Sequence, residues 1–330
     1  MFVAHWSEIV LAFAAVAAAS PNRPGPPASP GWPGSPGHGN GVKVLLTNDD
    51  GWAELNIRAQ NDALIAAGYN VVLSAPAENK SGTGSSTATP TVLNQTCEFN
   101  TCPVGSPPTG FNASNPRLNY VNAYPVDSAR FGIQKLAPKF FWSKPDLVFS
   151  GFNVGSNLGP VIQISGTVGA ACEAAKEGVP SIAFSAASGD QLSYTTLANK
   201  TAPSTLAARL YSALGIKFVD ALLSSHSHGP ILPPNVTVNV NYPATNASVC
   251  SQEKDFKYIF TRVLPDAGAV DVKTCGGTTL PDETTVVETL GAGCYVSVSV
   301  FNATTKADVN AETQEFVLRK LGKLLTCLPK

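Results

Sequence analysis

From residue 42 onward, short apolar runs alternate with segments that have helical spacing. Residues 43–47 form an apolar run that ends at Asn48, as expected of a strand that leads into a loop. Residues 55–67 follow with apolar side chains at helical spacing, and a second β-rich run covers residues 69–75. This strand–helix–strand order predicts a parallel sheet that is buried on both faces.

The alternation continues to about residue 240, and the C-terminal part differs. Residues 244–300 are rich in turns, β-formers and cysteines, and predict an antiparallel β appendage. Residues 314–326 predict an amphipathic closing helix. The fold class is therefore α/β: a Rossmann-like, doubly wound, mostly parallel sheet with a C-terminal antiparallel appendage and a closing helix. Between the two parts we predict strands at 146–150, 180–185 and 236–240, a loop at 151–166, and helices at 167–177 and 206–223.

The N-terminal segment has the pattern of a secretory signal. Eleven apolar residues, 9–19, end in three alanines followed by a serine, which fits a cleavage site with small residues. The run is too short to span a bilayer, so a membrane anchor is the weaker reading. We predict a signal peptide at 1–19, a disordered linker rich in proline and glycine at 20–41, and one globular domain at 42–330.

Composition restricts the function classes. Only 14% of the residues are charged and the net charge is −1, so the chain does not attract polyanions over long range. This argues against a protein that coats nucleic acid. Glycans offer another source of solubility, because the chain has seven Asn-x-Ser/Thr sequons. Their asparagines are Asn79, Asn94, Asn112, Asn199, Asn235, Asn246 and Asn302.

The seven cysteines agree with an oxidising compartment. Cys172 lies in an alanine-rich helical pattern and is predicted to be unpaired and buried. The other six lie in loop-like or C-terminal segments, and we predict a Cys97–Cys102 disulfide because it closes the shortest loop. A zinc site is the alternative, but there is no CxxC motif and no neighbouring histidine. Together these features predict a secreted, extracellular glycoprotein.

Three loops that follow predicted strands carry unusual polar residues. The first is Asn48-Asp49-Asp50-Gly51. Two adjacent carboxylates after a buried strand repel each other, and a cation offsets this cost most simply. The alternative is that Asp50 caps the next helix, which explains one aspartate but not the pair.

The second loop, residues 79–87, is rich in serine and glycine and includes Ser81. Its backbone N–H groups could approach an anion, and its hydroxyls could bind a metal or a phosphate. An ordinary surface loop is the simpler interpretation. The segment is not a dinucleotide fingerprint, because the third glycine and the following helix are missing.

The third loop, residues 150–159, places Asn153 and Asn157 four positions apart among glycines. Ser165, Gly166 and Thr167 follow at a predicted helix start, where the helix dipole favours a phosphate. The alternative is a glycine-rich loop followed by an ordinary serine cap.

Taken together, these residues resemble the SurE survival-protein family of metal-dependent nucleotidases and acid phosphatases. The family motif TNDDG is present at 47–51, SGxGxS at 81–86, and SGxNxGxNLG with SGTVGAA at 150–159 and 165–171. A weaker stretch at 124–128 is similar to the family motif TPADC. The chain departs from bacterial members at 52–55, at 160–161 and at Ile164, which concerns the wall of the pocket and hence nucleotide preference.

The resemblance implies specific roles. It places metal ligands on Asp49, Asp50, Ser81 and Asn153, and phosphate contacts on Asn157, Ser165, Gly166 and Thr167. These oxygen donors suit one divalent cation, Mg²⁺, Mn²⁺ or Ca²⁺, better than zinc. The cation would activate a water for attack on phosphorus, with Asp49 or Asp50 as the base. No histidine lies in a motif, so a phosphohistidine intermediate has no candidate residue.

The resulting hypothesis is a secreted, divalent-metal phosphomonoesterase of the acid phosphatase or 5′(3′)-nucleotidase type. Its substrate would be a small phosphate ester, such as a nucleoside monophosphate. The resemblance also implies a homodimer formed through residues 244–300. One alternative is a secreted, non-catalytic metal- or phosphate-binding module on the same fold. A nicotinamide oxidoreductase is a third, disfavoured by the missing glycine fingerprint.

Overall fold

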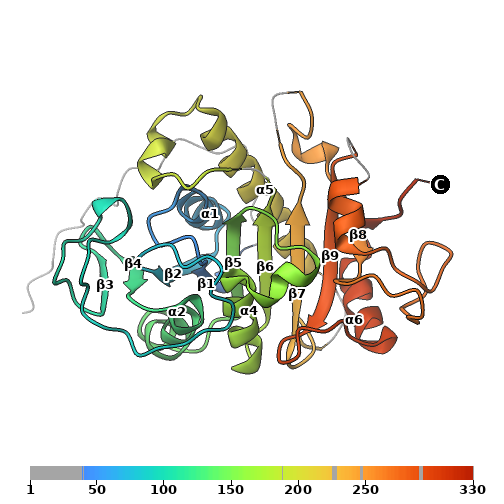
Figure 1. Ribbon diagram of the computed structural model, residues 1–330, viewed down its shortest axis with the longest axis horizontal. Coiled ribbons are helices and arrows are strands. Elements are labelled where there is room, and N and C mark those ends of the chain that lie inside the picture. The colour runs from blue at the N-terminus through green and yellow to red at the C-terminus, as the bar shows by residue number, and fades with distance from the viewer. Residues whose placement is uncertain are drawn as a thin grey trace, which may run out of the picture. The chain divides into compact units, whose positions relative to one another are not determined.

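Within the described part of the chain, ten strands form one sheet with the order β10-β8-β9-β7-β6-β5-β1-β2-β4-β3 (Figure 1). The computed structural model describes residue 39 and residues 41–329, except 188, 225–228, 246–247 and 290–292. The predicted signal peptide, nearly all of the predicted linker and the Asn246 sequon therefore lie outside the described residues. No described helix is long and apolar enough to cross a membrane.

The centre of the sheet is parallel, as predicted: β4, β2, β1, β5, β6 and β7 are parallel neighbours. The strands are β1 (Lys43–Thr47), β2 (Asn70–Pro76), β3 (Thr109–Asn112), β4 (Asn115–Val121), β5 (Leu147–Val154), β6 (Ser181–Ala186), β7 (Val236–Tyr242), β8 (Lys257–Thr261), β9 (Tyr295–Asn302) and β10 (Leu325–Thr326). The α-helices are α1 (Leu55–Ala66), α2 (Pro125–Phe131), α3 (Ala137–Phe141), α4 (Gly166–Lys176), α5 (Pro203–Leu223) and α6 (Ala311–Leu321).

Helices cover both faces of the sheet, so its central strands have apolar side chains on both sides. Leu45 of β1 packs with Val148 in one cluster, whereas Val44 and Leu46 point into the larger cluster on the other face. The larger cluster includes residues of α1, α5 and α6. Figure 1 shows α1 and α2 on opposite sides of the strands. This double burial explains the nearly continuous apolar runs in the sequence.

The C-terminal strands correct two predictions. β8, β9 and β10 are not a separate appendage: β9 pairs antiparallel with β7 and continues the same sheet. Among the C-terminal strands only the β7–β9 pairing is antiparallel, since β8 pairs parallel with both β9 and β10. The closing helix is also shorter than predicted, because α6 ends at Leu321 before Gly322 and the chain then forms β10.

The segment between β2 and β5 holds elements that the apolar pattern did not predict. β3 and β4 form an antiparallel hairpin at one edge of the sheet, and α2 and α3 follow it. β3 is only half-buried and has no continuous apolar run. β3 forms because β4 offers it a pairing partner, and its own pattern of apolar and polar residues does not predict a strand.

The cysteine predictions are confirmed. Cys97 and Cys102 form a disulfide, and Cys172 is a buried free thiol in α4. Two further disulfides, Cys250–Cys294 and Cys275–Cys327, link the C-terminal strands and their loops. The sequence left these two pairings open, because the strand order at this end was unknown.

Candidate active site

The three polar loops meet at the carboxyl ends of the central strands. β1 lies between β2 and β5, and Thr47 of β1 is in register with Ser150 of β5. The chain order runs outward from β1 in both directions, so the loops after these strands surround a topological switch point. Open α/β sheets bind ligands at such a point. The structure thus brings together residues that lie about a hundred positions apart.

Asp49 is held by the start of α4. Its Oδ1 accepts a hydrogen bond of 2.5 Å from the Thr167 hydroxyl, and its carbonyl accepts one of 2.7 Å from the Lys80 N–H. A Cβ at Gly166 would lie 2.8 Å from the Cβ of Asp49 and 2.8 Å from Pro125. Glycine at 166 therefore allows α4 to approach the aspartate closely.

Asp50 is held by three other segments. Its Oδ2 accepts a hydrogen bond of 2.8 Å from the Val154 N–H. Its Oδ1 accepts one from the Gln191 side chain and one of 3.4 Å from the Ser81 hydroxyl. The end of β5 and the loops after β2 and β6 thus all contact this carboxylate.

The two aspartates are buried without a compensating cation. Asp49 is 1% exposed and Asp50 is 0% exposed. Burial raises the pKa of both carboxyls, and the charge of Asp49 raises the pKa of Asp50 further. In the part of the chain that the structure describes, no lysine, arginine or histidine pairs with either. An added positive charge would relieve both costs.

Asn153 completes the set of oxygen donors. Its Nδ2 donates to the Gly155 carbonyl at 2.6 Å, and its Oδ1 accepts from the Thr167 hydroxyl at 3.3 Å. This fixes the amide so that its oxygen faces the same hydroxyl as Asp49. No three His, Cys, Asp or Glu side chains among the described residues gather as a metal group. A cation here would therefore need the amide and hydroxyl oxygens as well as the two carboxylates.

The serine- and glycine-rich loop is anchored beside α4. Gly84 has φ +56°, and its N–H donates to the Ile164 carbonyl at 2.8 Å. The TPADC-like stretch holds the far end of this loop, because Asp127 accepts hydrogen bonds from the Thr87 hydroxyl at 2.5 Å and the Ala88 N–H at 2.9 Å. The loop that carries Ser81 is therefore folded onto the site.

The predicted phosphate-contacting residues are all nearby, but each has a structural partner. Ser165 caps α4, because its hydroxyl accepts the Val168 N–H at 3.1 Å. The amide of Asn157 donates to the Ser185 hydroxyl at 2.8 Å. Both side chains are buried. The N–H groups of Gly166 and Thr167 donate to the Asp49 carboxylate. A phosphate role for this turn therefore stays a prediction.

Several residues of the site were not predicted. Gln191 lies in a loop whose sequence carries no pattern that would have indicated it. Glu54 caps α1, because its carboxylate accepts hydrogen bonds from the N–H groups of Asn56 and Ile57. Burial raises the pKa of Glu54, and the charge of Asp50 raises it further. Burial also raises the pKa of Glu98 to about 8. The acidic surroundings of the aspartates are thus larger than the motif suggests.

A buried hydrogen-bond network around Glu283 holds the third polar loop, residues 150–159, in place. Glu283 accepts hydrogen bonds from the Gly159 N–H at 2.7 Å, from the Asn239 amide at 3.0 Å and from the Ser299 hydroxyl at 2.9 Å. Asn239 also donates to the Asn157 carbonyl at 2.8 Å. This network ties the site to β7 and β9.

Comparison with known proteins agrees with this arrangement. The family described as Survival protein SurE matches residues 44–265, which include the three loops and the β1–α4 core. The chain belongs to the SurE family. A SurE protein of Aquifex aeolicus has the same fold, with a TM-score of 0.55 and 24% identity over 83% of this chain and 98% of that chain.

Relatives with named activities fall into two groups. The acid phosphatase of Yarrowia lipolytica is 34% identical over 319 residues, covering 88% of this chain and 87% of the relative. The 5′-nucleotidase SurE of Desulfovibrio desulfuricans is 33% identical over 217 residues, covering 62% of this chain and 67% of the relative. The acid phosphatase therefore covers a larger share of this chain than the 5′-nucleotidase does.

Proposed function

We propose that this chain hydrolyses phosphate monoesters with the help of one divalent cation at the β1–β5 switch point. Relatives that cover most of the chain are named acid phosphatase and 5′-nucleotidase. The observation that carries the proposal is the pair of buried aspartates, Asp49 and Asp50, which have no cationic partner among the described residues. A fold-stabilising role alone would not favour two adjacent carboxylates with raised pKa values.

The donor set fits a hard cation such as Mg²⁺, Mn²⁺ or Ca²⁺. Asp49, Asp50, Asn153 and Ser81 offer oxygen ligands, and all four lie within one connected set of hydrogen bonds. When bound, the cation would neutralise the carboxylates, polarise a phosphate oxygen and lower the pKa of a water.

The protein's own groups would supply positioning and proton transfer. The N–H groups of Gly166 and Thr167 at the start of α4 hydrogen-bond to the Asp49 carboxylate and hold it in place. The positive end of the helix dipole would still favour a phosphate beside this turn. Asp49 or Asp50 would take the proton of the attacking water. Thr167 holds the Asp49 carboxylate in place through its hydroxyl.

The test is hydrolysis of p-nitrophenyl phosphate and of nucleoside monophosphates by metal-stripped protein. We expect no turnover after EDTA treatment and recovery on addition of Mg²⁺, Mn²⁺ or Ca²⁺. Full activity in EDTA would contradict the metal role. Tight phosphate binding without turnover would favour a non-catalytic binding module instead.

We also propose that the protein is secreted. Three disulfides within the described residues support folding in an oxidising compartment. Expression in a eukaryotic host would test this by recovery of a shortened, glycosylated chain from the medium.

A further inference from the structure

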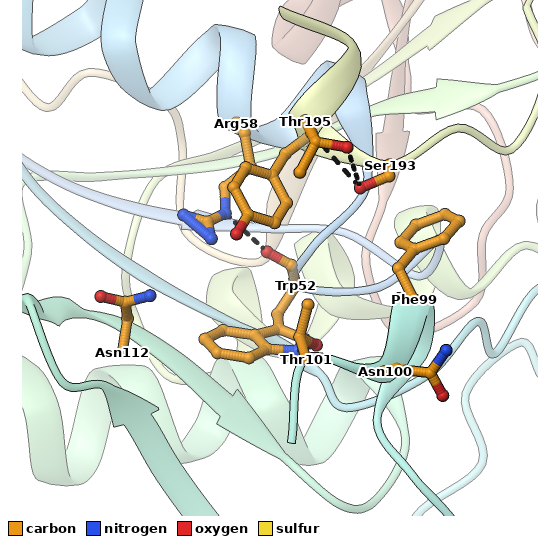
Figure 2. Close-up of a pocket in the computed structure, with 9 residues that line it drawn as sticks. Trp52, Arg58, Phe99, Asn100, Thr101, Asn112, Ser193 and Thr195 are labelled. Carbon is orange, nitrogen blue, oxygen red and sulfur yellow. Dashed lines mark hydrogen bonds between the residues drawn. The ribbon is translucent and has the colours of Figure 1, made fainter. Parts of the chain in front are cut away.

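A pocket of about 230 Å³ lies beside the aspartate loop (Figure 2). Four segments line it: the turn before α1 with the first turn of α1, the Cys97–Cys102 loop, the end of β3 and the segment after β6. The lining includes Trp52, Arg58, Phe99 and Tyr194, together with neutral polar side chains. Its volume corresponds to about seven or eight waters at ~30 Å³ each, so it suits a small group and not a large ligand.

The pocket is structurally tied to the candidate active site. Trp52 is two residues after Asp50, so their Cα atoms are at most about 7 Å apart. A Cβ at Gly51 would overlap the carboxylate of Glu98, which lies within the Cys97–Cys102 loop. Gln191, which donates to Asp50, lies three residues before Tyr194. Three of the four lining segments are thus connected to the carboxylate loop.

Arg58 is the charged group of the pocket. It is 7% exposed, and its Nε donates to the Trp52 carbonyl at 3.0 Å. The guanidinium carbon lies 4.5 Å from the Tyr194 ring centroid and 5.6 Å from the Trp52 ring centroid. The aromatic contacts and the carbonyl hold the guanidinium in one orientation. Figure 2 shows the hydrogen bond to the Trp52 carbonyl.

Within the described residues, the terminal nitrogens of Arg58 make no hydrogen bond and no ion pair, although the charge of Asp62, four residues further along α1, acts on the guanidinium. No aspartate or glutamate lines the pocket. A nearly buried guanidinium normally has its donors paired, because unsatisfied buried donors are costly. A fixed fork of free N–H donors matches the two oxygens of a carboxylate or a phosphate.

We propose that Arg58 recognises a second oxyanion on the substrate, a phosphate or a carboxylate a few bonds from the ester that is cleaved. This inference rests on the proposed function and assigns a leaving-group preference to the same site. The scissile phosphate would lie at Asp49, Asp50 and α4, and the second oxyanion would lie in the pocket. Arg58 is then a specificity-determining residue and takes no part in the chemical step.

Substrate pairs that differ in one group test the proposal. 3-Phosphoglycerate and glycerol 3-phosphate differ by a carboxylate, and 1,3-propanediol bisphosphate and 3-hydroxypropyl phosphate differ by a phosphate. We expect the wild-type protein to favour the member with two oxyanions by at least tenfold in kcat/KM. Arg58→Gln should remove this preference through KM, and Arg58→Lys should restore part of it. The pair that is discriminated identifies which oxyanion is recognised.

Two controls separate recognition from folding. Activity on p-nitrophenyl phosphate should change less than about threefold in Arg58→Gln, and Arg319→Gln on the exposed face of α6 should leave every substrate unchanged. Tyr194→Leu keeps the charge but removes one ring, so it should weaken the preference without abolishing it. Equal preference in the wild-type protein and Arg58→Gln would overturn the proposal, as would an equal loss on all substrates.

Direct binding keeps this test independent of catalysis. Isothermal titration of the four compounds into wild-type protein and Arg58→Gln should show the same preference even if none is hydrolysed. A failure of hydrolysis alone would contradict the proposed function and leave this result standing. Tighter binding of adenosine than of 3-phosphoglycerate, lost in Tyr194→Leu, would show that the pocket takes a planar base and would overturn the proposal.

Discussion

The Thr167 hydroxyl donates a hydrogen bond of 2.5 Å to Oδ1 of Asp49 across 118 positions of the chain. The same hydroxyl lies 3.3 Å from Oδ1 of Asn153. Thr167 therefore connects a residue after β1 with a residue of β5 and aligns two of the proposed ligands. The first turn of α4 serves both as an anion-favouring helix start and as a support for the donor set.

Asp50→Asn should abolish activity but not folding. The substitution removes one carboxylate from the donor set, and we expect turnover to fall by about a thousandfold or more, since metal catalysis supplies several kcal/mol and each tenfold in rate is about 1.4 kcal/mol. Without metal, the variant should be at least as stable as the wild-type protein, because it loses the repulsion from Asp49. Steady-state kinetics and urea denaturation measure the two effects.

Asp266→Asn is the matched control, since the Asp266 side chain is 56% exposed in the loop after β8. It should change neither rate nor metal dependence. Near-normal turnover in Asp50→Asn, with the same response to EDTA, would exclude Asp50 from the donor set.

Gly166→Ala should lower activity, although alanine is the better helix former. The new Cβ would lie 2.8 Å from the Cβ of Asp49 and 2.8 Å from Pro125, so α4 or the aspartate must move. We expect at least a tenfold loss in kcat/KM, since small displacements of a catalytic group are costly. Gly277→Ala is the control, because nothing lies within 4 Å of its new Cβ. Equal activity in both variants would show that the contact is unimportant.

Glu283 predicts a pH dependence of stability. Burial raises its pKa from 4.5 to about 8. Between these values the folded chain keeps a proton that the unfolded chain has released, so the free energy of unfolding should fall as pH rises, by at most about 1.4 kcal/mol per pH unit. Glu283→Gln has no proton to release and should show a flatter profile. Urea denaturation at a series of pH values measures it.

The exposed Glu312 of α6 provides the control for that profile. Glu312→Gln should leave the pH dependence unchanged. Parallel profiles for Glu283→Gln and the wild-type protein would mean that Glu283 is ionised in the folded state.

The cysteines should differ in reactivity. Burial raises the pKa of the Cys172 thiol to about 11, so it should not react with a thiol reagent until the protein is denatured. Peptide mapping without reduction should recover the three disulfides and one free Cys172. Replacing Cys275 and Cys327 by serine should cost about 4 kcal/mol of stability, because their disulfide closes a loop with a sequence separation of 52. Rapid labelling of Cys172 in the native protein would contradict this assignment.

The sequon at Asn79 should carry little or no glycan in active protein. The Asn79 side chain accepts a hydrogen bond of 2.7 Å from the Ser81 N–H. The N–H of Lys80, between these two residues, donates to the Asp49 carbonyl. A glycan here would stand at the entrance of the site. Glycopeptide mass spectrometry should instead find sugar on sequons such as the one at Asn199, whose side chain is exposed. High occupancy of Asn79 in fully active protein would remove Ser81 from the ligands.

The sequence alone determined the central fold and the chemistry of the first loops. Strands buried on both faces must be nearly all apolar, so β1, β2 and β6 were visible as runs. Adjacent aspartates repel each other and glycines lower the stability of regular structure, so both are costly unless a functional site requires them. For this reason the sequence indicated Asp49, Asp50 and Gly166 as site residues. The pairing of Cys97 with Cys102 followed from their short separation.

Only the tertiary structure decided which distant groups meet. Glu283 reaches Gly159 because β9 is placed beside β7, and neither residue marks this contact in the sequence. Nothing in the sequence distinguishes Arg58 from other polar residues of α1. Only the structure shows that its guanidinium lies against the rings of Trp52 and Tyr194. Local patterns record burial and backbone geometry. Contacts between separate segments depend on strand order, which the pattern of a single segment does not contain.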